Sequence, residues 1–446
     1  MDVHVPYGLM ADHTVSGLPS AREYHRTPIK VFNAVVRGLN KLGLARFPLQ
    51  EPSLIENARK QTGLQDFGDD SFLPRLRLLI DALNSEADLN PLGRLMQRQS
   101  ITSILRDRLY LHDLLTRHPE ILAREIPSPV VIVGLARSGT TRLHRLMASD
   151  PQFLHVKAWE SMNPVPYPES LKVRDTGQGM DPRITEIEQG LKIVLYMSPQ
   201  IAAVHPLGAH EVEEEIGLIM HDFSTQMFEV QAKVESFAEH LMTNDQTGAY
   251  RHMRTLMQVT SWFRNDPENK PWIMKSPQHV QDLDALLTVF PDAKLICPHR
   301  DPVKVVGSSC SMAWNSIVRD SDSIDPHWVG KEWLSKTRRM LTKNLSIRDA
   351  LPASQQHDVL YADITADWES SLQGIYNFLD LELSAIARQG MRDWLASNAQ
   401  HKHGAHKYSL EDFGISKEQV EQELLFYRQR FDIPFETKNP HIPPIK

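Results

Sequence analysis

The sequence predicts an α/β fold with three layers, in which a central parallel sheet is flanked by helices and extended by a helical N-terminal region. Four short apolar segments lead to this prediction, because each of them is followed by a stretch with helical character. These segments are Val130–Val133, Trp272–Met274, Lys294–Cys297 and Val359–Tyr361. Buried strands that alternate with helices are typical of a parallel sheet covered on both faces. The second observation is a glycine-bearing loop that directly follows the first of these segments, between residues 134 and 139.

Helical periodicity dominates the chain outside these segments. Residues 53–120 carry apolar side chains at the i, i+3, i+4, i+7 spacing of one helical face, as in Leu76, Leu79, Ile80 and Leu83. We expect residues 1–126 to form a mostly helical region that packs on the core, and residues 127–446 to form the main domain, with a helical insertion at about 182–266. Further predicted elements are helices at 331–351, 367–379 and about 416–430, and a short strand at 153–156.

The composition is that of a soluble globular protein, with 41% hydrophobic and 24% charged residues among 446. The formal net charge of −7 argues against a general nucleic-acid partner, which needs a broad basic surface. We expect no transmembrane segment, because no apolar run is long enough to cross a bilayer, and no signal peptide, because the start of the chain lacks an apolar core region. Cys297 and Cys310 are too few for a disulfide framework and are expected to be buried, reduced thiols. These features together favour a cytoplasmic location.

The loop after the first strand has the features of a phosphate cradle. Residues 130–133 read as a buried strand, the loop runs from Gly134 to Gly139, and a helix with apolar residues at 143, 146 and 147 follows. Backbone N–H groups at such a helix start point at an anion, and the helix dipole favours negative charge there. The nucleotide-hydrolase version of this P-loop-like arrangement carries a lysine after its last glycine. Here Thr140 stands in that place, and the cation is Arg137, inside the loop.

A second anion site is predicted after the strand at 294–297. Arg300 follows this strand, and Ser308 lies eight residues further on, in the first turns of a helix that Pro302 is suited to begin. A guanidinium at a strand end and a hydroxyl on the adjacent helix can bind one phosphate together. The alternative is that Arg300 pairs with Asp301 or with another surface carboxylate.

The two loops together resemble the sulfotransferase family that uses 3′-phosphoadenosine 5′-phosphosulfate (PAPS). The resemblance covers residues 128–365 and is strongest to the bacterial branch with an Arg-Ser-Gly-Thr-Thr loop, which is related to the tyrosyl-protein sulfotransferases. The segment 406–414 is also similar to the C-terminal end of that branch. The resemblance implies that PAPS is the co-substrate and that no metal is required. By the same resemblance Arg137, Ser138, Gly139, Thr140 and Thr141 hold the 5′-phosphosulfate, and Arg300 and Ser308 hold the 3′-phosphate.

Sulfuryl transfer is an in-line displacement that needs positioning, neutralisation of the leaving phosphate and a base for the acceptor proton. Arg137 is the first candidate for stabilising the leaving phosphate, because it is always charged. Lys275 matches the lysine of a motif that the cytosolic steroid and phenol enzymes carry at this place, but Pro277 stands where those enzymes have a catalytic histidine. Those enzymes also have a tryptophan where this chain has Arg142, so the partner of the adenine is left open.

The base has two candidates in the sequence. Glu160 is similar to the base of the tyrosyl-protein branch, and apolar neighbours such as Trp159 would raise its pKa. The alternative for Glu160 is an ion pair with a nearby arginine or lysine. His279 is the second candidate, alone or oriented by Glu160, and its alternative is a position at a helix start in contact with water.

The acceptor is expected to be a hydroxyl, or an amine, of a small or lipid-like molecule, and the sequence does not identify it. His205 and His210 either line its pocket or lie on the surface, and a group of apolar residues forms either core or pocket: Met220, Phe223, Met227 and Phe228. The histidines at 401–406 lack the ligand spacing of a metal site. The alternatives to a sulfotransferase are a nucleoside-triphosphate kinase or hydrolase and a non-catalytic nucleotide-binding protein. Assembly into a homo-oligomer is left open.

Overall fold

The computed structural model describes residues 18, 24–44, 47–198, 208–398 and 409–436. Its centre is a four-stranded sheet with the order β2-β1-β3-β4, in which every neighbouring pair is parallel. The strands are β1 (Val130–Ile132), β2 (Ile273–Lys275), β3 (Lys294–His299) and β4 (Gln356–Leu360). The predicted fold class is therefore confirmed. The largest difference is at β4, which begins three residues earlier than the sequence predicts because this edge strand starts with polar residues.

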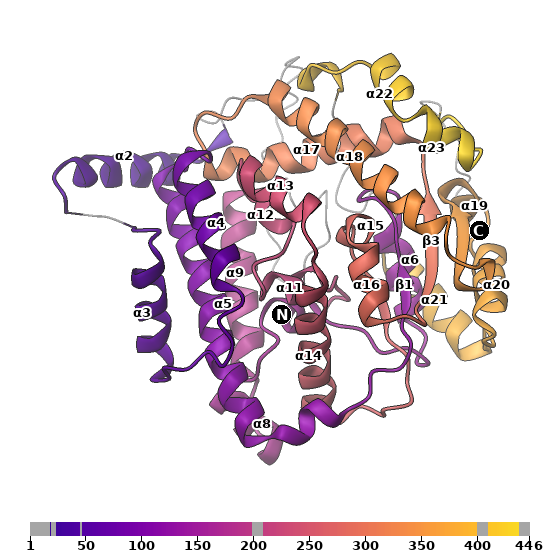
Figure 1. Ribbon diagram of the computed structural model, residues 1–446, viewed down its shortest axis with the longest axis horizontal. Coiled ribbons are helices and arrows are strands. Elements are labelled where there is room, and N and C mark those ends of the chain that lie inside the picture. Colours follow the sequence, from indigo (N-terminus) through magenta and orange to yellow (C-terminus); the bar gives the residue numbers. More distant parts are fainter. Residues whose placement is uncertain (1–17, 19–23, 45–46, 199–207, 399–408, 437–446) are drawn as a thin grey trace.

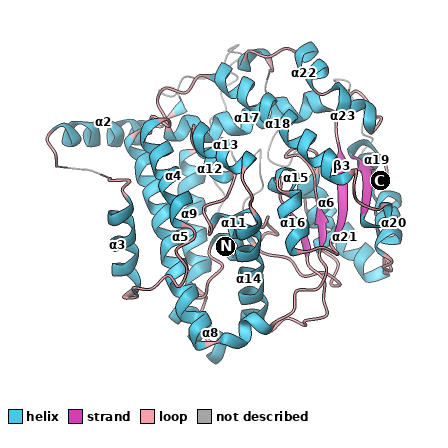
Figure 2. Cartoon of the chain, viewed as in Figure 1, coloured by secondary structure: helices cyan, strands magenta, loops and turns pink. Residues whose placement is uncertain are grey.

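Both faces of the sheet are buried, as alternating side chains of the strands show. Val131, Met274 and Leu295 belong to one apolar cluster, whereas Val130, Ile273 and Ile296 belong to another. The first cluster continues into α14 (Thr247–Arg264), α16 (Leu283–Val289), α17 (Pro302–Asp320) and α18 (Pro326–Arg348). The second continues into α6 (Thr140–Ala148), α20 (Trp368–Leu379) and α21 (Ala385–Ser397). These helices enclose the strands and complete the three layers (Figure 2).

The helices that precede the sheet in sequence lie at the other end of the molecule (Figure 1). They are α2 (Thr27–Lys41), α3 (Glu51–Thr62), α4 (Leu73–Ser85) and the long α5 (Pro91–Arg117). A third apolar cluster joins α3, α4 and α5 to three later helices, namely α11 (Ile216–Met220), α12 (Met227–Gln231) and α13 (Glu235–Thr243). Helices from the beginning of the chain thus share one core with helices that lie between β1 and β2 in sequence.

The remaining elements are short except for α9, which has 16 residues. They are η1 (Pro119–Ala123), α7 (Ala158–Met162), α8 (Pro168–Thr176), α9 (Pro182–Met197), α15 (Gln278–Gln281), η2 (Ala353–Gln355), α19 (Tyr361–Ala366), η3 (Glu411–Phe413), α22 (Lys417–Glu423) and α23 (Leu425–Arg430). Among the helices in the described ranges, none is both long and apolar enough to cross a bilayer.

Two sequence predictions differ from these elements. The short strand expected at 153–156 is reduced to a single parallel bridge between Leu154 and Trp272, because the chain turns into α7 soon afterwards. The helix expected at about 416–430 is interrupted at Leu424, whose side chain is fully buried. This break lets both halves turn apolar residues, such as Val420 and Tyr427, into the core.

The parallel strands bring their carboxyl ends to one edge of the sheet. The loop after β1, the end of β2 at Lys275, Arg300 after β3 and Tyr361 after β4 all emerge there. In open α/β sheets this edge is where ligands bind. The candidate site is therefore built at this edge.

Candidate active site at the carboxyl edge of the sheet

The loop between β1 and α6 is held in a left-handed turn. The φ angle is 72° at Arg137 and 87° at Gly139. A Cβ atom at Gly139 would lie 2.5 Å from the Tyr361 ring, so only glycine fits this position. Ser138 closes the turn, because its Oγ donates to the carbonyl of Leu135 at 2.7 Å. Helix α6 then begins at Thr140 with N–H groups that have no partner inside the helix, which makes its N-terminus suitable for an anion.

The two predicted anion-binding segments are in direct contact. Arg137 donates from Nε to the Ser308 hydroxyl at 2.9 Å. Arg300 donates from Nη1 to the carbonyl oxygen of Arg137 at 2.8 Å. Residues far apart in sequence, on the β1–α6 loop and on the β3–α17 unit, therefore form one cationic cluster of a size that a single nucleotide can span.

Arg300 also binds a carboxylate, although not the one suggested by the sequence. Its Nε and Nη2 atoms form a fork on the two oxygens of Glu436, at 2.7 and 2.9 Å. Asp301 has another role, because it caps α17 by accepting from Val303 N and it binds Arg428 at 2.7 Å. The acidic partner of Arg300 thus comes from the segment after α23.

Two residues that sequence reasoning did not assign border this cluster. Tyr361 begins α19, and the Arg300 guanidinium lies 4.1 Å from its ring centroid. Arg142 has a buried Nε without a hydrogen-bond partner among the described residues, and burial lowers the pKa of its guanidinium. The position of Tyr361 was recognisable, because it ends a predicted strand at the edge where ligands bind. The role of Arg142 was left open.

Lys275 lies at the end of β2 and is almost completely buried, with 1% exposure. Its ammonium donates to the Thr141 hydroxyl at 3.2 Å and forms an ion pair with Glu214. Its backbone N–H donates to Glu215 Oε2 at 2.8 Å. From the sequence alone, the acidic run at 213–215 is assigned no role in the site. The signal that was missed is that three consecutive glutamates precede the buried helix α11, where two of them are brought to Lys275.

His279 is fully buried on α15, so the alternative of a position in contact with water is wrong. Its Nδ1 lies 2.8 Å from the Tyr250 hydroxyl, and its Nε2 lies 3.6 Å from Glu215 Oε2. Burial lowers the pKa of His279 to about 3 and raises the pKa of Glu215 to about 8, so both groups are uncharged near neutral pH. A side chain with no exposed surface in this conformation does not reach an acceptor.

Glu160 forms the ion pair that the sequence left open as the alternative to a base. Glu160 is 3% exposed, and both of its oxygens already accept hydrogen bonds. One comes from Arg264 Nε at 2.7 Å, and one from the N–H of Lys157 at 2.8 Å. The Arg264 guanidinium lies 5.7 Å from the ring of Trp272, which precedes β2. The pair is thus near the beginning of β2, whereas Lys275 and the cradle are at its end.

Comparison with known proteins decides the kind of enzyme. A model of the sulfotransferase family matches residues 129–385, more than half of the chain. The chain belongs to the sulfotransferase family. It is 25% identical over 310 residues to omega-hydroxy-beta-dihydromenaquinone-9 sulfotransferase Stf3 of Mycobacterium bovis and of Mycobacterium tuberculosis. The aligned residues cover 65% of this chain and 72% of each relative.

Two crystal structures of mycobacterial sulfotransferases are similar to most of this chain. Sulfotransferase STF1 from Mycobacterium tuberculosis has a TM-score of 0.72 at 30% identity and covers 84% of this chain and 98% of its own. Sulfotransferase STF9 from Mycobacterium avium has a TM-score of 0.76 at 25% identity and covers 88% of this chain and 99% of its own. The protein is therefore an enzyme that transfers a sulfuryl group from a donor to an acceptor. The kinase, hydrolase and non-catalytic alternatives are set aside.

The structure also describes most of the other residues that were considered for the acceptor pocket. Met220, Phe223 and Phe228 belong to the core that α4 and α5 share, which supports the core interpretation. His210 is exposed, whereas His205 and the histidines at 401–406 lie outside the described residues. Cys297 and Cys310 are free and buried, as predicted.

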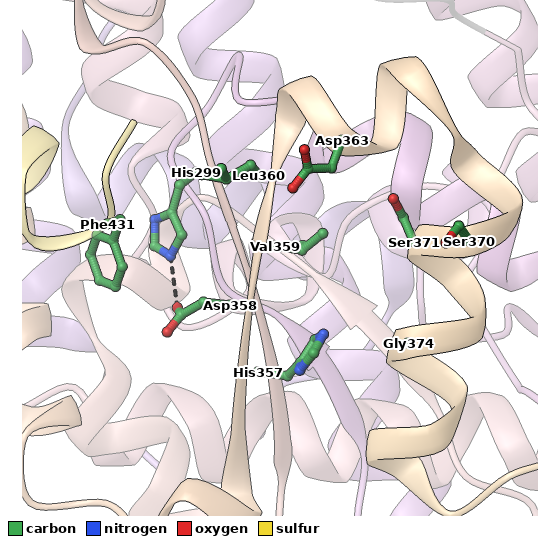
Figure 3. A pocket seen from close by; sticks show the side chains of 10 residues that line it. All are labelled: His299, His357, Asp358, Val359, Leu360, Asp363, Ser370, Ser371, Gly374 and Phe431. Atoms are coloured by element: carbon green, nitrogen blue, oxygen red, sulfur yellow. Dashed lines mark hydrogen bonds and ion pairs between the residues drawn. The ribbon is translucent and has the colours of Figure 1, made fainter. Parts of the chain in front are cut away.

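A cavity of about 390 Å³ is drawn in Figure 3, and its lining includes none of the residues of the cradle. It borders β4, α19, α20 and Phe431. Asp358 on its wall is held by His299 at 2.7 Å and by Arg348 at 2.6 Å. The side chains that line it include aspartates but no arginine or lysine, so it does not favour phosphate groups.

Proposed function

We propose that this sulfotransferase uses PAPS as its donor and a hydroxyl group of a lipid-like molecule as its acceptor. The observation that carries the donor assignment is the pair of contacts from Arg137 to Ser308 and from Arg300 to the Arg137 carbonyl. They unite two anion-binding segments at one sheet edge. An adenosine with phosphates at both its 3′ and 5′ positions has two anionic ends and matches such a cluster.

The residues at this edge fit that nucleotide. The N-terminus of α6, with Arg137 and Thr141, would hold the 5′ end, because free N–H groups and a cation converge there. Arg300 and Ser308 would hold the 3′-phosphate, which then replaces the Glu436 carboxylate on the guanidinium fork. The Tyr361 ring and the unpartnered Arg142 Nε would border the adenosine. PAPS, when bound, supplies a sulfuryl group that is activated by its bond to the 5′-phosphate.

The base that we propose for this reaction is Glu214, in place of Glu160 and His279. Glu214 is paired with Lys275, whose ammonium lies 3.2 Å from the Thr141 hydroxyl of the cradle. Its side chain is 16% exposed, compared with 4% for Glu160 and 0% for His279. Of these three candidates, Glu214 is the one that is paired with a residue of the cradle region and is also partly exposed.

The backbone on both sides of Glu214 is fixed. Ser161 donates to the Glu214 carbonyl, and the N–H of the preceding residue, Glu213, donates to the carbonyl of Val156 at 3.0 Å. Glu214 would accept the proton of the acceptor hydroxyl as the acceptor oxygen bonds to sulfur. The bond between sulfur and the 5′-phosphate breaks, and its electron pair stays on the phosphate. Arg137 and Lys275 would neutralise that charge.

Changing Glu214 to glutamine tests the base directly. An aliphatic alcohol such as farnesol needs a base, whereas p-nitrophenol ionises near neutral pH unaided. We expect kcat for farnesol to fall about 10²–10⁴-fold in Glu214→Gln, with a much smaller loss for p-nitrophenol and unchanged affinity for adenosine 3′,5′-bisphosphate. The control is Glu211→Gln, since Glu211 lies on the same segment but binds Arg145 at 3.1 Å. Equal losses with both acceptors, or no loss, would remove Glu214 from this role.

The lipid-like acceptor is supported by the name of the curated relative, which acts on a menaquinone derivative. The test is incubation with PAPS carrying radiolabelled sulfate and a panel of isoprenoid alcohols, phenols and sugars. We expect label in an isoprenoid alcohol, and no transfer by Arg137→Ala. Transfer only to sugars would contradict the acceptor class. Failure to use PAPS with any acceptor, together with turnover of magnesium ATP, would contradict the donor.

A further inference from the structure

We propose that helix α2, together with the end of α9, rests on the surface of an anionic lipid bilayer. This inference extends the proposed function, because a lipid-like acceptor is held in a membrane, but it stands on separate observations. They are the exposed apolar side chains of α2, its charge, and the way in which its opposite face is anchored.

Helix α2 exposes an apolar stripe. Val31 and Val35 are each 54% exposed, and Leu42, just after the helix, is 71% exposed. Positions i, i+4 and i+11 lie along one side of a helix, so these three side chains form a continuous strip. Leu44 adds a further side chain with 72% exposure. Single exposed apolar residues need no explanation, but a stripe of them on one helix indicates an interaction surface.

The charge of the helix favours an anionic partner. The segment Arg26–Lys41 contains no acidic residue, although the whole chain has a net charge of −7. Its basic residues include Lys30 and Lys41, which are exposed, whereas Arg37 is paired with Asp322. A helix with basic residues on one side and exposed apolar residues on another is typical of a segment that lies in the interface of an anionic membrane.

The opposite face of α2 is fixed to the body of the protein. Ile29, Asn33 and Val36 are buried, and the Asn33 side chain accepts a hydrogen bond from the N–H of Leu92 at 3.0 Å. This contact joins α2 to the beginning of α5. The helix therefore needs no partner in order to be ordered, and its outer stripe is presented on a rigid support at the periphery of the molecule (Figure 1).

The end of α9 continues this surface. Tyr196 and Ile193 are 48% and 54% exposed, and the Arg26 guanidinium lies 4.7 Å from the Tyr196 ring centroid. The cation–π contact places the end of α9 beside the start of α2. A tyrosine next to arginine and lysine side chains suits the headgroup region of a bilayer, because its ring is apolar and its hydroxyl is polar.

Flotation of the full-length protein with vesicles tests this inference. Vesicles of phosphatidylcholine with phosphatidylglycerol are compared with vesicles of phosphatidylcholine alone. We expect the wild type to float with the anionic vesicles, more weakly at high salt, and little with the neutral ones. The double variant Val31→Asp/Val35→Asp should lose binding at least about tenfold, and Lys30→Ala/Lys41→Ala should lose about fivefold per lysine on the anionic vesicles only.

The matched control is Ile386→Asp on α21, an apolar residue with 70% exposure beside the sheet and far from α2 (Figure 1). It should bind vesicles as the wild type does. Unchanged affinity for adenosine 3′,5′-bisphosphate shows that each variant is folded. The inference is overturned if the wild type does not float with anionic vesicles, if Val31→Asp/Val35→Asp floats like the wild type, or if the stripe instead mediates a dimer that the double variant dissociates. Vesicle binding without sulfation of any lipid alcohol would contradict the proposed acceptor and leave the docking surface in place.

Discussion

Two groups of charged side chains lie near the sheet, and they differ in how their functional atoms are used. In the cradle, Arg300 is 23% exposed, and its partners are a carbonyl oxygen and the carboxylate of Glu436. Beside the beginning of β2, the side chain of Glu160 is 4% exposed, and both of its oxygens are taken by Arg264 and a backbone N–H. In the proposed function an anion replaces Glu436 at the cradle, whereas a ligand would reach Glu160 only by breaking a buried pair. Both groups contain an arginine paired with a glutamate, and they differ in how accessible the charged atoms are to a ligand.

The largest expected effect is a loss of stability when Glu160 is removed. We predict that Glu160→Ala lowers the free energy of unfolding by about 3–5 kcal/mol, because it leaves the Arg264 guanidinium without its carboxylate in a mostly buried place. The turnover per folded molecule should stay close to that of the wild type. Urea denaturation measures the first quantity, and kcat normalised to the nucleotide-binding fraction measures the second. Normal stability with a large loss of kcat would restore Glu160 as the base.

An intermediate effect is expected from the buried network of Glu215 and His279. The pKa of Glu215 is raised from 4.5 to about 8 by burial, so the folded state keeps a proton that the unfolded state loses. Raising the pH from about 4.5 to about 8 should therefore destabilise the wild type, and Glu215→Gln should not share this loss. We predict that the variant gains about 4 kcal/mol relative to the wild type across this window. If the free energies of unfolding of the wild type and of Glu215→Gln changed in parallel with pH, the Glu215 carboxyl would be ionised in the folded protein and the prediction would be wrong.

The smallest expected effect concerns Glu436, which competes with a phosphate for Arg300. In Glu436→Gln the Arg300 guanidinium faces a neutral amide in place of a carboxylate. A phosphate that displaces this side chain therefore breaks a weaker interaction. We predict that adenosine 3′,5′-bisphosphate binds roughly fivefold more tightly, about 1 kcal/mol, by calorimetry. Glu423→Gln is the matched control, since Glu423 pairs with Arg338 in an exposed position. Weaker binding by Glu436→Gln would mean that this carboxylate supports the site.

Sequence reasoning found the parts of the fold and of the site that local patterns encode. Alternating apolar segments and helices located the four strands, and glycine-rich and Arg/Ser patterns located the two segments that meet at the carboxyl edge of the sheet. The two segments lie close together because β1 and β3 are neighbouring parallel strands, so the loops that follow them lie at the same edge of the sheet.

The parts that were missed depend on contacts between distant residues. Nothing near Glu160 in sequence shows that Arg264 would reach it across the fold. Nothing near Arg300 shows that a residue of the C-terminal segment, Glu436, would occupy its fork. Glu214 was passed over because the pattern of three glutamates also suits an ordinary helix start. The hydrogen bond from the Lys275 N–H to Glu215 and the ion pair between Lys275 and Glu214 join this run to the end of β2, and neither is visible in the local sequence.

The central claim is that one adenosine bisphosphate spans the two anion-binding segments, and its most direct test is the contribution of the 3′-phosphate. Calorimetry compares adenosine 3′,5′-bisphosphate with adenosine 5′-phosphate on the wild type, on Arg300→Ala, and on Arg430→Ala, an exposed control paired with Asp349. We predict that the wild type and Arg430→Ala prefer the bisphosphate by about 2–5 kcal/mol, and that Arg300→Ala binds both nucleotides equally. Equal affinities in the wild type, or an intact preference in Arg300→Ala, would contradict the claim.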